Sequence, residues 1–229
     1  ICMNVKKILP QGIRNRIWSI LKNQLIKIRQ ESEKKYPQYT LDKIHLSNAR
    51  LLMDRNELLT LLPHKGVVAE LGVDEGDYSA DIISHNQPLK LHLVDLWSSQ
   101  RYNTKKKVKV QERFSKEIEN GSVEINFGLS TVVSEIFPDN YFDWIYIDTT
   151  HAYEQTLLEL HAYKPKMKEN GVIAGHDFVR WAENGLARFG VIEAVSEFCV
   201  KENWEFLYLT MENSNLPSFA IRSLKSPAV

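Results

Sequence analysis

Acidic and imidazole side chains directly follow apolar runs of this 229-residue sequence. Asp148 and His151 come after one run, and His176 and Asp177 end the next. A carboxylate can hold a hard cation, and an imidazole, with an ordinary pKa of about 6.5, can accept a proton near neutral pH. Such groups at successive strand ends indicate a chemical site. In the alternative interpretation, Asp148 caps the next helix and His151 is an ordinary polar residue of its first turn.

The elements that would position these residues alternate between apolar runs typical of strands and segments with helical spacing. This alternation predicts an α/β fold with a doubly wound, Rossmann-like, mostly parallel sheet, whose ligands bind outside the carboxyl ends of the strands. Seven strands are expected, and the last is antiparallel because only residues 212–217 separate it from its neighbour. The expected strands are 66–72, 89–97, 122–128, 142–148, 170–178, 204–211 and 218–224, and the expected helices are 76–87, 105–120, 130–137, 152–168 and 190–203.

The N-terminal part of the chain has a different pattern. Apolar residues at helical spacing predict an amphipathic helix over 13–35, and a second helix is expected from Ser47 or Asn48 to about Gly66. We therefore expect a helical extension over 1–46 and one domain over 47–229. The first 35 residues carry nine basic and two acidic side chains. This helix could contact a phosphate-bearing partner, close over the core, or pack on another subunit of a homo-oligomer.

Bulk composition restricts the class of protein. Lys plus Arg and Asp plus Glu are balanced at 29 each, so no overall field would recruit nucleic acid or an anionic membrane. Cys2 and Cys199 have neither the spacing of a metal finger nor the number of a disulfide framework. No apolar run reaches the length of a membrane span, and no signal core follows the first residues. We expect a cytoplasmic protein with no membrane span and no nucleic-acid partner.

The turn after the first predicted strand, ELGVDEG, discriminates between two nucleotide cofactors. A dinucleotide fingerprint would have glycine in place of Glu70, and Asp74 would repel a pyrophosphate. A ligand with an ammonium and a sulfonium fits better, and S-adenosylmethionine is such a ligand. Gly72 would let the backbone run close beneath its methionine portion, Glu70 would balance the ammonium, and Gly76 would open the following helix.

The end of the second predicted strand completes this cofactor prediction. Asp95 lies nineteen residues after Gly76, where an acid accepts hydrogen bonds from both ribose hydroxyls of a nucleoside. Leu96 and Trp97 follow it and are expected beside the cofactor. Trp97 could stack on the adenine or on the substrate, although a packed aromatic side chain is the commoner outcome.

Three strings of the sequence together resemble a known family: ELGVDEG, then VDLW, then FDWIYIDTTHAYEQTLLELHAYKPKMKENGVIAGHDF. They are similar to the class I S-adenosylmethionine-dependent methyltransferases, and most similar to the branch that contains macrocin- and mycinamicin-type sugar O-methyltransferases. The resemblance extends over about residues 51–222, and its most specific part is 142–178. It implies a cofactor set of Glu70, Gly72, Gly76 and Asp95, together with Ser130 near the adenine or ribose.

The resemblance also implies a mechanism. In metal-dependent members of that branch, acids at the ends of the fourth and fifth strands hold a magnesium ion, which gathers two vicinal hydroxyls of the acceptor. Asp148 and Asp177 match these positions, and His151 matches the general base. Many relatives carry two adjacent acids after the fifth strand, whereas this chain has His176 beside Asp177. One oxygen ligand is thereby lost, and His176 becomes the neighbouring metal candidate.

The sequence therefore predicts a methyltransferase that methylates an oxygen of a small hydroxylated acceptor, such as a sugar or glycosylated metabolite, with magnesium as a candidate second cofactor. Methyl transfer from a sulfonium is an in-line displacement, so the protein must mainly align donor and acceptor and deprotonate the acceptor. Two alternatives stay open. Basic residues of the N-terminal helix and of 105–109 could serve an RNA methyltransferase, although no Asn/Asp-Pro-Pro-aromatic motif is present. The chain could also be a noncatalytic cofactor-binding scaffold.

Overall fold

The computed structural model describes residues 10–182, 185–212 and 216–224. The chain divides into two compact units, residues 1–37 and 38–229. The first unit contains α1 (Gln11–Glu33), which confirms the predicted N-terminal helix and has no buried residue. Within the described residues, no helix is both long and apolar enough to cross a bilayer. The domain boundary at residue 46 stays a prediction.

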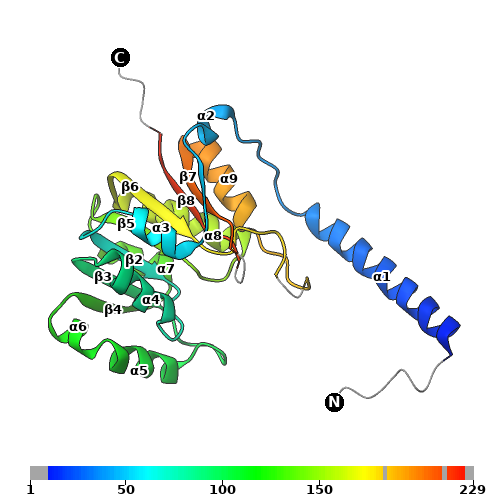
Figure 1. The fold of residues 1–229 in the computed structure, drawn as a ribbon, viewed down its shortest axis with the longest axis horizontal. Helices are drawn as coiled ribbons and strands as arrows, with labels where there is room; N and C mark the ends of the chain where they lie inside the picture. The colour runs from blue at the N-terminus through cyan, green and yellow to red at the C-terminus, as the bar shows by residue number, and fades with distance from the viewer. Residues whose placement is uncertain (1–9, 183–184, 213–215, 225–229) are drawn as a thin grey trace. The chain divides into compact units, whose positions relative to one another are not determined.

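The second unit is built on one eight-stranded sheet with the order β1-β7-β8-β6-β5-β2-β3-β4 (Figure 1). Neighbouring strands are parallel, except that β8 runs antiparallel to both β6 and β7. This confirms the predicted α/β class, the mostly parallel Rossmann-like sheet and the antiparallel last strand. The strands are β1 (Arg50–Leu52), β2 (Val67–Leu71), β3 (Lys90–Asp95), β4 (Val123–Phe127), β5 (Phe142–Ile147), β6 (Met167–Gly175), β7 (Trp204–Thr210) and β8 (Phe219–Ser223).

The strand that the sequence did not predict is β1. It corrects the prediction of a helix from Ser47 to about Gly66. Ser47 instead ends the short helix α2 (Lys43–Leu46), where its hydroxyl donates to the carbonyl oxygen of Lys43 at 2.7 Å. The next helix, α3 (Arg55–Leu61), begins later because the side chain of Asp54 accepts from the backbone N–H of Glu57 at 2.9 Å. Residues 50–52 are thereby free to pair with β7.

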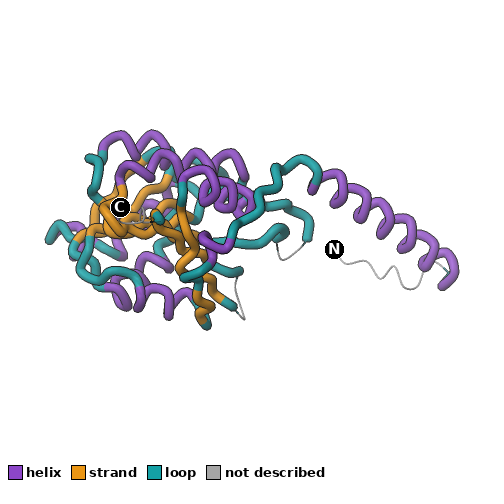
Figure 2. Tube along the Cα trace, turned by 90° about the horizontal axis from the view of Figure 1, so that it is seen from above, coloured by secondary structure: helices purple, strands orange, loops and turns teal. Residues whose placement is uncertain are grey.

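Helices cover both faces of this sheet (Figure 2). Three of the predicted helices break into shorter pieces than expected, because a 3-10 or π turn ends or follows each regular segment, as with the π-helix at Ile82–Asn86. The predicted helix 105–120 is divided at Phe114 into two helices. The remaining helices are α4 (Asp77–Asp81), α5 (Thr104–Arg113), α6 (Ser115–Glu119), α7 (Ser130–Val133), α8 (Tyr153–Tyr163) and α9 (Val191–Glu202), with 3-10 turns at Ser134–Ile136 and Lys164–Lys166.

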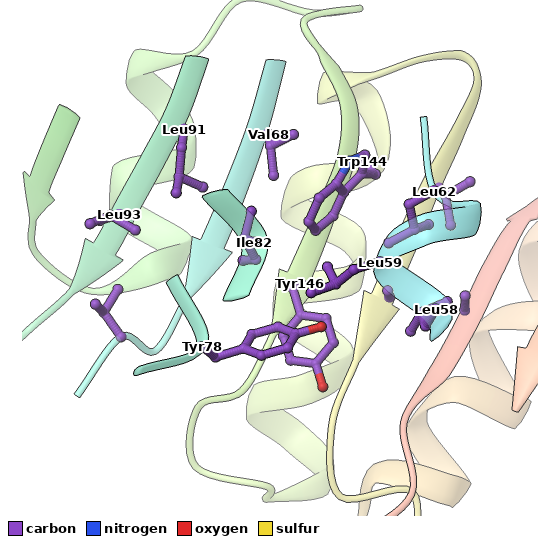
Figure 3. Close-up of a cluster of buried hydrophobic side chains, with 14 of the residues drawn as sticks. Leu58, Leu59, Leu62, Val68, Tyr78, Ile82, Leu91, Leu93, Trp144 and Tyr146 are labelled. Carbon is purple, nitrogen blue, oxygen red and sulfur yellow. The ribbon is translucent and has the colours of Figure 1, made fainter. Parts of the chain in front are cut away.

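Two hydrophobic cores lie on opposite faces of the sheet because successive strand residues point to opposite sides. On β5, Trp144 and Tyr146 belong to the core covered by α3, α4 and α5, whereas Ile145 and Ile147 belong to the core covered by α7, α8 and α9. Figure 3 shows the first core, where the ring of Tyr78 from α4 lies against Tyr146 at a centroid distance of 4.3 Å. This contact packs α4 against β5.

Gly72, directly after β2, marks the closest approach of two strand ends. Its φ is +90°, and a Cβ built there would overlap the carbonyl oxygen of Asp148 at the end of β5. The glycine predicted to approach a cofactor is therefore also required for the packing of the protein itself.

Replacing this glycine should be costly for stability. We expect Gly72→Ala to lower the free energy of unfolding by more than about 3 kcal/mol, because backbone strain at positive φ adds to the overlap with Asp148. The matched control is Gly121→Ala, where φ is +79° but a Cβ would meet nothing within 4 Å. It should cost only about 1 to 2 kcal/mol of strain. Equal losses for the two variants in urea unfolding would show that the overlap is relieved without cost.

Candidate active site

A cavity of about 570 Å³ opens at the carboxyl ends of β2, β3, β5 and β6. It brings together nearly every residue that the sequence singled out for chemistry. Gly76 is the exception. It is the N-cap residue of α4 at a φ of +78°, and a Cβ there would lie 2.7 Å from Phe114, so its role is packing between helices. The predicted residues that line the cavity are Glu70, Gly72, Asp74, Asp95, Leu96, Trp97, Ser130, Asp148, His151, His176 and Asp177.

Asp95 joins the end of β3 to the turn after β2. One carboxylate oxygen accepts from the backbone N–H groups of Val73 and Asp74 at 2.8 and 3.1 Å, and the other accepts from that of Trp97 at 2.9 Å. The Trp97 indole N–H donates to the carbonyl oxygen of Asp74 at 2.9 Å, and only 1% of the residue is exposed. Trp97 therefore braces this loop, which matches the packed alternative for it. The carboxylate oxygen of Asp95 that accepts only from Trp97 keeps accepting capacity for a ligand.

Asp74 carries less uncompensated charge than the sequence suggested. Lys106 of α5 forms an ion pair with its carboxylate, and this contact raises the pKa of Lys106. The repulsion of a pyrophosphate by Asp74 is correspondingly weaker than expected, and Glu70 is the stronger reason against a dinucleotide.

Glu70 and Arg55 bring a carboxyl group and a guanidinium to the same cavity. Glu70 is 2% exposed, and burial raises the pKa of its carboxyl well above the ordinary value, although the hydroxyl of Ser79 donates to it. The guanidinium of Arg55, in the first turn of α3, lies 4.6 Å from the centroid of the Tyr78 ring. It forms no ion pair with a carboxylate within the described part of the chain. Within the described part of the chain, the buried hydroxyl of Tyr78 has no hydrogen-bond partner.

The second half of the cavity contains a cluster of acids and imidazoles. Nδ1 of His151 lies 2.9 Å from a carboxylate oxygen of Asp177, and Nδ1 of His176 lies 3.3 and 3.6 Å from oxygens of Asp177 and Asp148. Asp148, His151 and Asp177 each offer one possible metal-ligand atom, and these three atoms lie within 4.8 Å of one another. Nε2 of His176 is buried without a partner in the described structure.

Burial and mutual contact shift the pKa values of this cluster in different directions. Burial raises the pKa of Asp148, and the nearby imidazoles only partly offset this. Burial acts most strongly and would raise the pKa of Asp177, but the hydrogen bond from His151 and the attraction of nearby charges, that of His151 first, together outweigh it and the pKa is lowered. For His151, burial acts most strongly and would lower the pKa, but the hydrogen bond to Asp177 and the negative charges of Asp177 and Asp148 together outweigh it and the pKa is raised. The His151–Asp177 contact is thus a charge-assisted hydrogen bond.

Strand register and left-handed backbone turns position this cluster. Ile147 of β5 pairs with Gly175 of β6, so the following residues of the two strands emerge side by side. His151 and Asp177 then adopt φ values of +58° and +55°, an uncommon conformation for residues with a side chain. The loop before α9 holds the backbone of His151 in this conformation, because the N–H of Gly190 donates to the carbonyl oxygen of His151 at 2.8 Å.

Ser130 lies in a buried network that the sequence did not indicate. Its hydroxyl donates to the carboxylate of Glu159 on α8, which also accepts from the hydroxyl of Thr149 at 2.8 Å and from the amide of Gln155 at 3.1 Å. Glu159 is fully buried, and burial raises the pKa of its carboxyl. The network ties the end of β5 to the start of α7 and so shapes one wall of the cavity.

Comparison with known proteins agrees with this fold and site. Residues 69–178 match a family model described as a methyltransferase domain. No curated protein sequence matches the chain. Among solved structures, the chain is similar to the Bacillus subtilis M1A22 tRNA methyltransferase TrmK, with 12% identity, a TM-score of 0.54, and coverage of 76% of this chain and 67% of that one.

Two further structures share the fold. The pyocyanin biosynthetic protein PhzM is 11% identical, with a TM-score of 0.55 over 74% of this chain and 54% of that one. Spermidine synthase from Thermotoga maritima is 17% identical, with a TM-score of 0.51 over 74% of this chain and 58% of that one. This chain thus spans little more than half the length of these two proteins. At such identities the likeness concerns the fold.

The methyltransferase domain, the Rossmann-like sheet and the cavity at its carboxyl edge together define the class. Residues 69–178 are a methyltransferase domain with the fold of the class I enzymes, and they support a methyltransferase that uses S-adenosylmethionine as methyl donor. The matched domain contains all the residues that line the cavity except Arg55. The type of acceptor and the narrower resemblance to sugar O-methyltransferases stay predictions.

The loop anchored by Asp95 gives a stability test that is independent of ligands. We expect Asp95→Asn to lower the free energy of unfolding by about 2 to 3 kcal/mol, because at least one backbone N–H would lose a charged acceptor and face an amide NH₂. Asp77→Asn is the control, since Asp77 is an exposed acid of α4 that pairs with Arg113. It should cost less than about 1 kcal/mol. Similar values for both variants in urea unfolding would contradict the anchoring role.

Proposed function

We propose that the protein transfers the methyl group of S-adenosylmethionine to a hydroxyl oxygen of a small hydroxylated acceptor, such as a sugar or a glycosylated metabolite. The observation that carries this proposal is the cluster of Asp148, His151 and Asp177 beside the cofactor half of the cavity. A hydroxyl must lose its proton during methyl transfer, and an imidazole held by a carboxylate is suited to accept it. The cavity is also of a size typical for small ligands.

The cofactor half of the cavity supports a definite placement of S-adenosylmethionine. In this pose Asp95 accepts from the ribose hydroxyls, Glu70 balances the ammonium, and Arg55 pairs with the carboxylate of the methionine portion. A zwitterionic group needs one partner of each charge, and Glu70 and Arg55 both line this cavity. The proposed neighbours of the cofactor are completed by Gly72, Asp74, Leu96, Trp97, Ser130 and Asp148.

The reaction follows from this placement. The acceptor oxygen attacks the methyl carbon in line with the carbon–sulfur bond, which breaks with its electron pair on sulfur and leaves S-adenosylhomocysteine. The acceptor proton passes to His151, whose Nδ1 is held by Asp177, so Nε2 is the nitrogen that accepts it. Asp177 is a positioning residue for the imidazole in this scheme.

A divalent cation fits the same cluster. Asp148 and Asp177 supply the carboxylate oxygens that magnesium prefers, while His176 borders both and would support them as a nitrogen donor. When bound, magnesium would supply Lewis acidity that makes an acceptor hydroxyl easier to deprotonate. The donor set is poorer than a site with three acids, because His176 stands where a further carboxylate would add an oxygen.

The RNA alternative loses part of its support from the sequence. Lys106, Lys109 and Arg113 of α5 form ion pairs with acids of the turn after β2 and the start of α4. Their charge is therefore partly compensated within the protein, which weakens this helix as a phosphate-binding surface. The predicted absence of a nucleic-acid partner remains part of the proposal.

Arg55 can be tested with two ligands that differ only in the amino-acid portion. We expect Arg55→Gln to weaken binding of S-adenosylhomocysteine by about tenfold to a hundredfold, because the ligand carboxylate would lose a charged donor. Binding of 5′-methylthioadenosine, which lacks that carboxylate, should be unchanged. Arg101→Gln, at an exposed arginine of the cavity rim, is the control variant. Equal weakening of both ligands in calorimetric titrations would refute the assignment.

The role of His151 can be separated from cofactor binding. We expect His151→Ala to lower methyl transfer to the best of a panel of glycosides by about 10² to 10⁴-fold, because the general base is lost. Its affinity for S-adenosylhomocysteine should stay the same. The control is His161→Ala, which replaces an exposed histidine of α8 that pairs with Glu202. Released S-adenosylhomocysteine is measured with and without magnesium.

The same assay distinguishes the rival functions. Methylation of a tRNA or rRNA transcript in place of every glycoside would establish the RNA alternative. Cofactor binding without turnover on any acceptor, in the parent and in both variants alike, would favour a noncatalytic scaffold.

A further inference from the structure

The helix α1 carries an apolar face that is exposed along its whole length. Its large apolar side chains are 43 to 69% exposed, and none of its residues is buried. At about 3.6 residues per turn, most of them fall on one side of the helix. The members of this apolar face are Ile13, Ile17, Ile20, Leu21, Leu25 and Ile28, with Trp18 at its edge.

Positive charge borders this face, apart from Arg14, whose helical position falls between those of Leu21 and Leu25. Residues 11–30 contain five basic side chains and no acidic one. By helical position, Lys22 lies beyond the Trp18 edge of the apolar face and Lys27 lies beyond the Ile20 edge. An apolar face with an aromatic residue at its border and lysines on both flanks is typical of a helix that lies in the interface of a membrane. The basic side chains are Arg14, Arg16, Lys22, Lys27 and Arg29.

We propose that α1 is a peripheral membrane anchor that binds the surface of an anionic lipid bilayer, with its apolar face among the acyl chains and its lysines among the lipid phosphates. Charge complementarity carries the choice of partner, since a run of five cations without an acid matches an anionic surface. The helix is too polar to cross the bilayer, which agrees with a position parallel to its surface.

A second copy of the helix is a poorer partner. Starting at Ile13, the spacing of a two-stranded coiled coil continues through Ile17 and Ile20 but then reaches Gln24 and Lys27. A second register through Trp18, Leu21, Leu25 and Ile28 is apolar, but it covers less than two heptads between Arg14 and Ser32, which is short for a coiled coil. Pairing of two such helices would also bring their basic flanks together without acids of residues 11–30 to compensate them. The homo-oligomer expected as one alternative from the sequence is therefore the less favoured occupant.

RNA would satisfy only part of this surface. Phosphates could pair with the lysines, but an RNA backbone offers nothing to cover the isoleucines and leucines, which would stay in water. A lipid surface suits both the basic flanks and the apolar face of α1. Burial of one apolar side chain favours binding by about 1.5 to 3 kcal/mol. The proposal is independent of the acceptor and of the mechanism given above.

The test is sedimentation of the whole 229-residue chain with vesicles of phosphatidylcholine, alone or mixed with phosphatidylglycerol. We expect binding to the mixed vesicles that weakens with salt, and little binding to phosphatidylcholine alone. Ile17→Gln should lower binding at least tenfold. Ile26→Gln is the matched control, because Ile26 lies on the opposite side of the same helix and the change in side chain is identical. Its binding should remain close to that of the parent.

Charge is tested separately. The double variant Lys22→Glu/Lys27→Glu should lower binding to mixed vesicles by more than tenfold. All variants should bind S-adenosylhomocysteine as the parent does, which keeps the result distinct from any failure of the methyltransferase proposal. Equal binding to both vesicle types, or equal loss for Ile17→Gln and Ile26→Gln, would overturn the proposal. The proposal would also be overturned if light scattering showed a dimer that Ile17→Gln dissociates, or a monomer that does not bind either type of vesicle.

Discussion

The rest of the structure depends on the close approach of three strand ends at the centre of the sheet. The N–H of Gly72 donates to the carbonyl oxygen of Val94 at the end of β3, and the N–H of Asp148 donates to that of Leu71 at the end of β2. From β2 the chain builds outward through β3 and β4, then returns to β5 on the other side of β2. The segments that follow β2 and β5 therefore diverge, and the crevice between them is where ligands of such sheets bind.

Charged groups are retained in this crevice because most of them have partners. Three backbone N–H groups satisfy Asp95, three side chains donate to Glu159, and His151 supports Asp177. Glu70 and Arg55 are less completely satisfied, since one hydroxyl donates to the first, and the second has the ring of Tyr78 and the hydroxyl of Tyr146 beside it but forms no ion pair with a described carboxylate. A buried charge is costly without a partner, so these two are where a bound ligand would stabilise the protein most.

Much of the fold could be predicted because long apolar runs have a clear period. β5 and β6 were predicted as strands, and the residues after them fell at one sheet edge, which brought Asp148 and Asp177 together as expected. β1 was missed because three residues carry too little pattern to compete with a helical spacing on both sides. The division at Asp54 depends on a side-chain cap, and that cap was visible in the sequence only as one polar residue among several.

The sequence by itself determined the order and type of the elements, the polar residues at the strand ends, and a turn that favours S-adenosylmethionine over a dinucleotide. These properties are local, because periodicity and turn chemistry depend on neighbouring residues. Only the tertiary structure decided that Arg55 and Glu159 reach the cavity, that Lys106 compensates Asp74, and that Gly72 lies against a carbonyl oxygen. Each of these contacts joins residues far apart in the chain, and their distance is set by how helices pack on the sheet.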